Sequence, residues 1–166
     1  MSVIKELFSK PVLIFGCGNI LIGDDGFGPS VIDHLLAHFD LPANVAAFDV
    51  GTGIREFLFD LALLPGKREA IFIVDAVFES GRPPGEVFEL GVGGLPENKV
   101  NDFCPHMFPS VNLLEYLQNN AGVRIRVLTV QAESMQIEIR QGLSNPVNAA
   151  VPVACRWLME RIGELS

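Results

Sequence analysis

Short apolar runs alternate with amphipathic segments along this chain of 166 residues. The runs at 11–15, 45–50 and 70–74 are short, and glycine or aspartate follows each of them, which is typical of buried strands. The helices predicted between and after them occupy residues 29–39, 53–63, 110–118 and 146–162. Strands that alternate with helices predict an α/β protein, here a three-layer α/β/α sandwich around a mostly parallel twisted sheet.

Two further segments complete the predicted sheet. Residues 123–130 alternate apolar residues with arginines, as a half-exposed strand does, and 86–90 form a short strand expected near a sheet edge. Residues 91–107 follow no regular pattern. Because no repeat, low-complexity tract or linker divides the chain, residues 1–166 are expected to form a single domain.

Composition narrows the class of protein. Hydrophobic residues make up 49% of the chain, yet no apolar run approaches the roughly 20 residues that cross a bilayer. The N-terminus lacks the apolar core of a secretory signal, so a cytoplasmic protein without a membrane segment is expected. The net charge of −8 argues against a nucleic-acid partner. The three cysteines form no CxxC pair, which favours reduced thiols over disulfides.

The glycine-rich turn at residues 16–28 carries two adjacent acids, Asp24 and Asp25. A dinucleotide-binding turn would need a third glycine where Leu21 stands, and the aspartates would repel a pyrophosphate. The turn therefore favours a cation or a proton-transfer site. Asp24 alone also fits a cap of the following helix or a partner that supports Asp25.

Three aspartates are expected at one edge of the sheet. Asp25 follows the first predicted strand, Asp49 ends the second and Asp75 ends the third. The carboxyl ends of parallel strands form the ligand crevice in such sheets. Asp25 and Asp75, together with His106, make a donor set that suits nickel or zinc. Taken singly, each residue also fits a cap, a turn or a solvated loop.

A cysteine nucleophile is a weaker alternative. Cys17 lies in the glycine-rich turn and Cys104 lies close to His106, but no feature nearby indicates a lowered thiol pKa. Cys17 also fits a small residue packed at a tight turn. His34 and His38 are four residues apart, so they share a helix face, where they are predicted to be solvated residues rather than ligands.

In their order, these motifs resemble those of the nickel–iron hydrogenase maturation endopeptidases. The resemblance covers residues 11 to 155 and rests on segments 16–21, 23–29, 49–53, 73–76, 84–86 and 105–106. Segments 16–29 and 49–53 are most similar to the branch that serves deazaflavin-reducing hydrogenases. The resemblance implies an α/β/α sandwich, in agreement with the pattern of strands and helices.

The resemblance also implies an activity. The family removes a C-terminal extension from the hydrogenase large-subunit precursor after nickel insertion. By motif position, Asp25, Asp75 and His106 correspond to its metal-binding residues, and Asp25 and Asp75 would be the catalytic acids of an aspartic-type endopeptidase. Family members carry glutamate or aspartate at the position of Asp25. Nickel would be supplied by the precursor, and a monomer would suffice.

Two alternatives stay open from the sequence. Asp49, Gly51, Thr52 and Gly53 are candidates for contacting the substrate or an oxyanion, although the same glycines fit a simple helix-opening turn. The same three ligands would also serve a nickel-sensing chaperone or an accessory subunit that binds the large subunit without cutting it.

Overall fold

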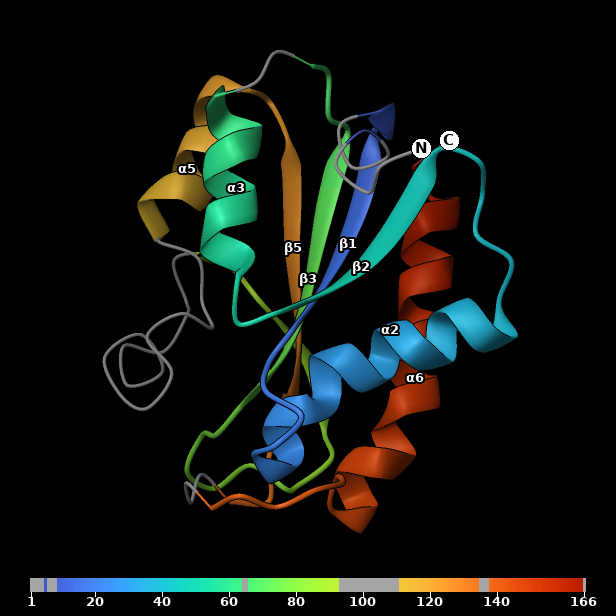
Figure 1. Ribbon diagram of the computed structural model, residues 1–166, viewed down its shortest axis with the longest axis vertical. Coiled ribbons are helices and arrows are strands. Elements are labelled where there is room, and N and C mark those ends of the chain that lie inside the picture. Colours follow the sequence, from blue (N-terminus) through green and yellow to red (C-terminus); the bar gives the residue numbers. More distant parts are fainter. Residues whose placement is uncertain (1–4, 6–8, 64–65, 93–110, 135–137, 166) are drawn as a thin grey trace.

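A five-stranded, mostly parallel sheet forms the centre of the fold (Figure 1). The structure is a computed structural model that describes residues 5, 9–63, 66–92, 111–134 and 138–165. The strands, given in their order across the sheet, are β2 (Val45–Gly51), β1 (Val12–Cys17), β3 (Ala70–Val77), β5 (Arg124–Gln131) and β4 (Val87–Leu90). β4 pairs antiparallel with β5 and the other pairs are parallel, which confirms the edge position predicted for 86–90.

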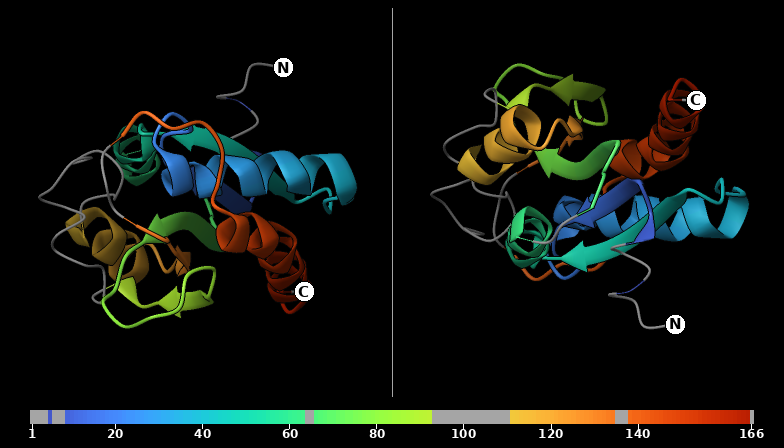
Figure 2. Two further views of the ribbon diagram at one scale, coloured as in Figure 1. Left: turned by 90° about the horizontal axis from the view of Figure 1, so that it is seen from below. Right: turned by 90° about the horizontal axis from the view of Figure 1, so that it is seen from above.

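Helices cover both faces of the sheet, as Figure 2 shows from its two ends. The helices are α2 (Phe27–His38), α3 (Ile54–Leu63), α5 (Val111–Asn120) and α6 (Asn145–Gly163), with a short 3-10 helix, η1 (Gly23–Gly26), before α2. α2 and α6 share one hydrophobic core with the sheet, and α3 and α5 share the other. The predicted α/β/α sandwich is therefore confirmed. Within the described residues, no helix combines the length and apolarity that crossing a bilayer requires.

Burial on both faces explains the continuous apolar runs of the central strands. Every residue of β1 and β3 is buried. Along β1, Leu13 and Phe15 pack towards α3 and α5, whereas Val12 and Ile14 pack towards α2 and α6. Central parallel strands need apolar residues at consecutive positions because helices cover both of their faces.

Several element boundaries differ from the sequence predictions, and β2 continues past Asp49 to Gly51. β3 continues to Val77 because its pairing with β5 continues, so Asp75 lies within the strand rather than at its end. β1 continues to Cys17, and α2 begins at Phe27, with Pro29 in its first turn, where a missing N–H costs no helical hydrogen bond. β5 is exposed only near its start and is otherwise more buried than a half-exposed strand.

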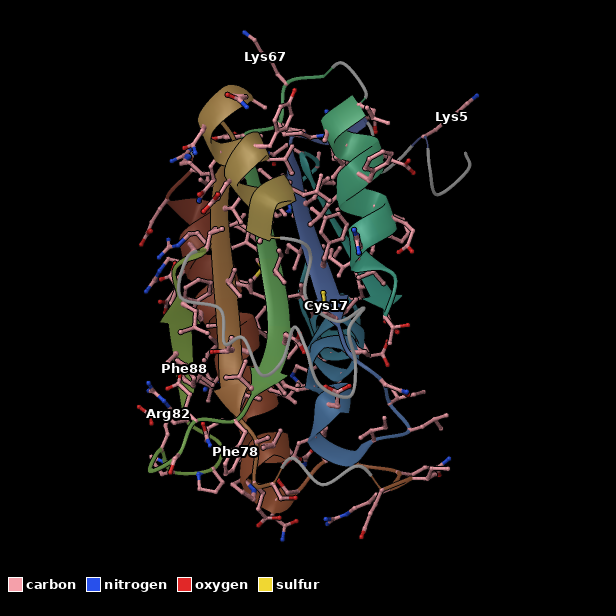
Figure 3. All side chains as sticks on the ribbon, turned by 90° about the vertical axis from the view of Figure 1, so that its left-hand side faces the viewer. Lys5, Cys17, Lys67, Phe78, Arg82 and Phe88 are labelled. Atoms are coloured by element: carbon pink, nitrogen blue, oxygen red, sulfur yellow. The ribbon has the colours of Figure 1, made fainter. Side chains whose placement is uncertain are left out.

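Charged side chains secure the edge formed by β4. Arg126 on β5 donates two hydrogen bonds to the Glu89 carboxylate, at 2.7 and 2.8 Å. The Arg82 guanidinium lies 3.6 Å from the centre of the Phe88 ring, and Figure 3 shows these two side chains side by side. Short, charged edge strands discourage pairing with other chains.

Glycines allow α2 to lie directly against the sheet. A Cβ atom added at Gly28 would lie 2.5 Å from the Val74 carbonyl oxygen and closer still to the backbone of Cys17. One added at Gly16 would lie 2.5 Å from the Gly28 carbonyl oxygen. The start of α2 is thus in contact with the backbones of both β1 and β3. This contact leaves no room for a side chain.

Replacing Gly28 with alanine is expected to lower the free energy of unfolding by about 1–3 kcal/mol or more, because the helix must move off the sheet. Gly91→Ala is the matched control, since a Cβ there would meet no atom within 4 Å. The control should change stability by no more than about 0.5 kcal/mol. Urea unfolding, followed by circular dichroism, measures the free energy of unfolding of both variants. Equal stability of the two would contradict the close contact between α2 and the sheet at Gly28.

Candidate functional site

The carboxyl ends of β1 and β3 form the switch point of the sheet. From β1 the chain passes through α2 to β2 on one side, whereas β3 leads to β4 and β5 on the other. Ligands of open α/β sheets bind where the connections diverge in this way. Asp25 follows β1 in η1, Asp75 lies near the end of β3, and η1 packs against β3. The two candidate acids are thus brought to the switch point.

Asp75 is a fully buried carboxylate in the centre of the sheet. Its exposure is 0%, and its Oδ1 accepts a hydrogen bond of 2.8 Å from the Ala76 N–H. Its neighbours in the alternating pattern, Ile73 and Val77, pack in the core beneath α3 and α5. Withdrawing a carboxylate from water is costly, and buried charges are found where they are paired or bind metal. An aspartate here, rather than an aliphatic residue, makes Asp75 a candidate functional residue.

Asp25 is a half-buried carboxylate oriented by the glycine-rich turn. Its Oδ2 accepts a 2.8 Å hydrogen bond from the Asn19 N–H. The Asn19 side chain in turn accepts one of 3.0 Å from the Leu21 N–H. The turn is attached to β2 because the Gly18 N–H donates to the Gly51 carbonyl at 2.9 Å. The turn therefore fixes the direction in which Asp25 points.

Asp24 has a structural role that the sequence did not reveal. It is 8% exposed and accepts hydrogen bonds from the Glu133 N–H at 2.8 Å and from Ser144, through its N–H at 2.7 Å and its hydroxyl at 2.9 Å. Asp24 therefore links η1 to the end of β5 and the start of α6. The alternative that it caps the helix following it is wrong, because α2 has no side-chain cap.

A backbone bridge reinforces this link. The Gly23 N–H donates to the Arg140 carbonyl at 2.7 Å, and the Arg140 N–H donates to the Leu21 carbonyl at 2.8 Å. The partners of Asp24 lie 109 and 120 residues away in the chain, so no local sequence signal could have identified them.

A shallow hollow of about 250 Å³ lies beside the turn, at the ends of β1 and β2. It is lined by Gly18, Asn19, Ile20, Pro29, Asp49, Gly51 and Thr52. The Gly51 N–H donates to Asp49 Oδ1 at 2.9 Å, and the Gly53 N–H donates to the Val50 carbonyl at 2.9 Å. Both amides are therefore engaged within the turn. A bound chain would first meet the exposed Asp49 and Thr52 side chains.

The remaining predicted ligand, His106, lies outside the described residues, as does Cys104. In the part of the chain that the structure describes, no three His, Cys, Asp or Glu residues are placed to hold a metal ion. Asp25 and Asp75 are therefore two of the three predicted ligands, and the third is not described.

Burial weakens the cysteine-nucleophile alternative for Cys17. Cys17 is 0% exposed and lies at the end of β1 on the side of the sheet seen in Figure 3. Burial raises the pKa of the Cys155 thiol to about 11. A buried thiol in apolar surroundings is inert as a nucleophile.

Comparison with known proteins gives consistent matches. Residues 29–161 match the family described as hydrogenase maturation protease. The chain is 32% identical over 162 residues to the coenzyme F420 hydrogenase subunit delta of Methanothermobacter thermautotrophicus, covering 94% of this chain and 97% of that protein.

Solved structures agree with these matches. The hydrogenase maturating endopeptidase HybD of Escherichia coli has a TM-score of 0.74 at 28% identity, over 92% of each chain. The hydrogenase 2 maturation peptidase of a Thaumarchaeota archaeon has a TM-score of 0.62 at 32% identity, over 93% of this chain and 99% of that one.

Replacing Asp24 with asparagine is expected to lower the free energy of unfolding by about 2–3 kcal/mol, because an amide nitrogen then faces buried donors. Ser144→Ala removes one of the three hydrogen bonds and should cost about 1 kcal/mol. Asp33→Asn on the exposed face of α2 is the control. Chemical unfolding measures the free energy of unfolding of the three variants. An Asp24 variant as stable as the control would exclude the structural role of Asp24.

Proposed function

The chain belongs to the hydrogenase maturation protease family, and we propose that it is the endopeptidase that removes the C-terminal extension of a nickel–iron hydrogenase large-subunit precursor. The observation that carries the proposal is the placement of Asp25 and Asp75 at the switch point of the sheet. The similarity to HybD at 28% identity supports the reaction class. The similarity to a coenzyme F420 hydrogenase subunit supports a deazaflavin-reducing hydrogenase as the partner.

Nickel enters this proposal as part of the substrate. Asp25, Asp75 and His106 would bind nickel that the precursor carries, since carboxylate and imidazole donors suit that ion. Without the ion, two carboxylates at one site repel each other, and the precursor makes no metal-mediated contact with them. With the ion, their charges are offset. Affinity would therefore rise only for the loaded precursor.

Hydrolysis of the amide requires an activated water, a stabilised oxyanion and a protonated leaving amine. A carboxylate at the site would take a proton as the water oxygen bonds to the scissile carbonyl carbon. It would return that proton to the nitrogen as the carbon–nitrogen bond breaks. Asp25 is the better placed of the two for this exchange because it is half-buried, whereas Asp75 is fully buried.

The hollow beside the turn would hold the precursor chain next to the cleavage point. Asp49 and Thr52 present exposed polar groups there, and Ile20 adds an apolar side chain that is 59% exposed. Contacts of both kinds suit an extended peptide. We expect the protein to act as a monomer in the cytoplasm.

A second candidate function is that of a nickel-sensing chaperone or an accessory subunit. The name of the Methanothermobacter relative, a hydrogenase subunit, favours this alternative. The same donor residues would serve it without a hydrolytic step.

Incubation of the protein with nickel-loaded and nickel-free precursor separates the two functions. If the protein is the peptidase, mass spectrometry should find a C-terminal peptide that is released from the loaded precursor alone. The nickel-free sample is the internal control. A stable complex that forms without loss of mass would instead support the accessory subunit.

Replacing Asp25 with asparagine is expected to lower the cleavage rate about 100-fold or more, because the amide cannot accept the proton from water. Asp75→Asn should lower it comparably, and Asp33→Asn on α2 should leave it unchanged. Single-turnover cleavage of loaded precursor measures all three, with unfolding curves to verify that each variant folds. Cleavage by Asp25→Asn at the unmodified rate would remove Asp25 from the mechanism.

A further inference from the structure

Two histidines on α2 face each other outside the switch point. The ring centres of His34 and His38 are 4.3 Å apart, and the ring planes are inclined by 44°. His34 is half-buried and His38 is exposed. A helix rises about 1.5 Å per residue, so the pair lies roughly 10–17 Å along the axis from the start of α2, where Asp25 precedes it. The pair is therefore separate from the candidate catalytic acids.

The separation of the rings suits a shared metal ion. Histidines four residues apart on one helix face are a recurring pair of zinc ligands. Metal–nitrogen bonds of about 2.0–2.1 Å, with an angle of about 90–110° at the ion, place the centres of two imidazoles roughly 4.5–5.2 Å apart. The observed 4.3 Å is close to the lower end of this range. Small rotations of the two side chains would therefore bring the rings to chelating distance without movement of the backbone.

The surroundings favour a cation. His38 is in the last turn of α2, where the carbonyl groups of the helix end carry partial negative charge. Exposed carboxylates of Asp33 and Asp40 lie next to the pair in the chain, and α2 contains no lysine or arginine. No positive charge on the helix itself opposes an incoming ion.

We propose that His34 and His38 form a surface chelating site for a divalent ion of the nickel, copper and zinc class, with water completing the coordination. Imidazole nitrogen suits each of these ions. The sequence predicted solvated histidines, and the distance between their rings is what changes that interpretation. The site does not depend on the proposed peptidase activity. It would bind free metal in the absence of any precursor.

Calorimetric titration of the full chain with nickel chloride tests the proposal, together with thermal unfolding with and without nickel. Nickel should bind and raise the Tm, since an ion that binds the folded state stabilises it. His34→Gln and His38→Gln should each weaken this binding by about tenfold or more, because one ligand alone loses the chelate. Glutamine is a good helix former, so both variants should fold.

A variant on the opposite face of the sheet supplies the control. Asp60→Asn on the exposed side of α3 keeps the pair on α2 and should retain both its nickel binding and the rise in Tm. Absence of nickel binding by the unmodified chain would overturn the proposal, as would unchanged binding in His34→Gln and His38→Gln. Either result can be read without a cleavage assay, so failure of this proposal is distinguishable from failure of the peptidase.

Discussion

The direct contact between α2 and the backbones of β1 and β3 sets the position of the candidate site. Because Gly28 has no side chain, the first turn of α2 lies against Cys17 and Val74. η1 immediately precedes that turn and carries Asp25. Val74 directly precedes Asp75, so the same contact brings both acids to one end of the sheet. Any side chain at position 28 would move the helix away, and Asp25 would move with it.

The two adjacent aspartates of the turn have different environments. Asp24 is buried and its oxygens are occupied by Glu133 and Ser144. Asp25 is half-buried, and an N–H of its own turn holds one of its oxygens. One acid attaches the turn to the rest of the molecule, and the next is held by its own turn beside the switch point. A fixed support beneath a functional residue keeps its geometry within the tolerance that chemistry requires.

The fold could be predicted from the sequence because its signals are local. Apolar runs and helical spacing identified the layers, and the short strand of β4 was correctly placed at an edge. The length of β3 could not be predicted, because β5 supplies the pairing that carries the strand past Asp75. The role of Asp24 depends on partners more than 100 residues away. Asp25 and Asp75 were recognised as candidates from their positions after strands, but the roles assigned to them and to His106 stay predictions.

The attachment of η1 through Asp24 has a consequence for local motion. Hydrogen bonds join the turn to Glu133, after β5, and to Ser144, the residue that precedes α6. Segments joined in this way open as one cooperative unit rather than separately. Transient fraying of the C-terminal helix at its first turn would therefore release the turn that carries Asp25. The amide hydrogens of Ser144 and Asn19 should then exchange with solvent at a common rate, although they lie at opposite ends of the chain.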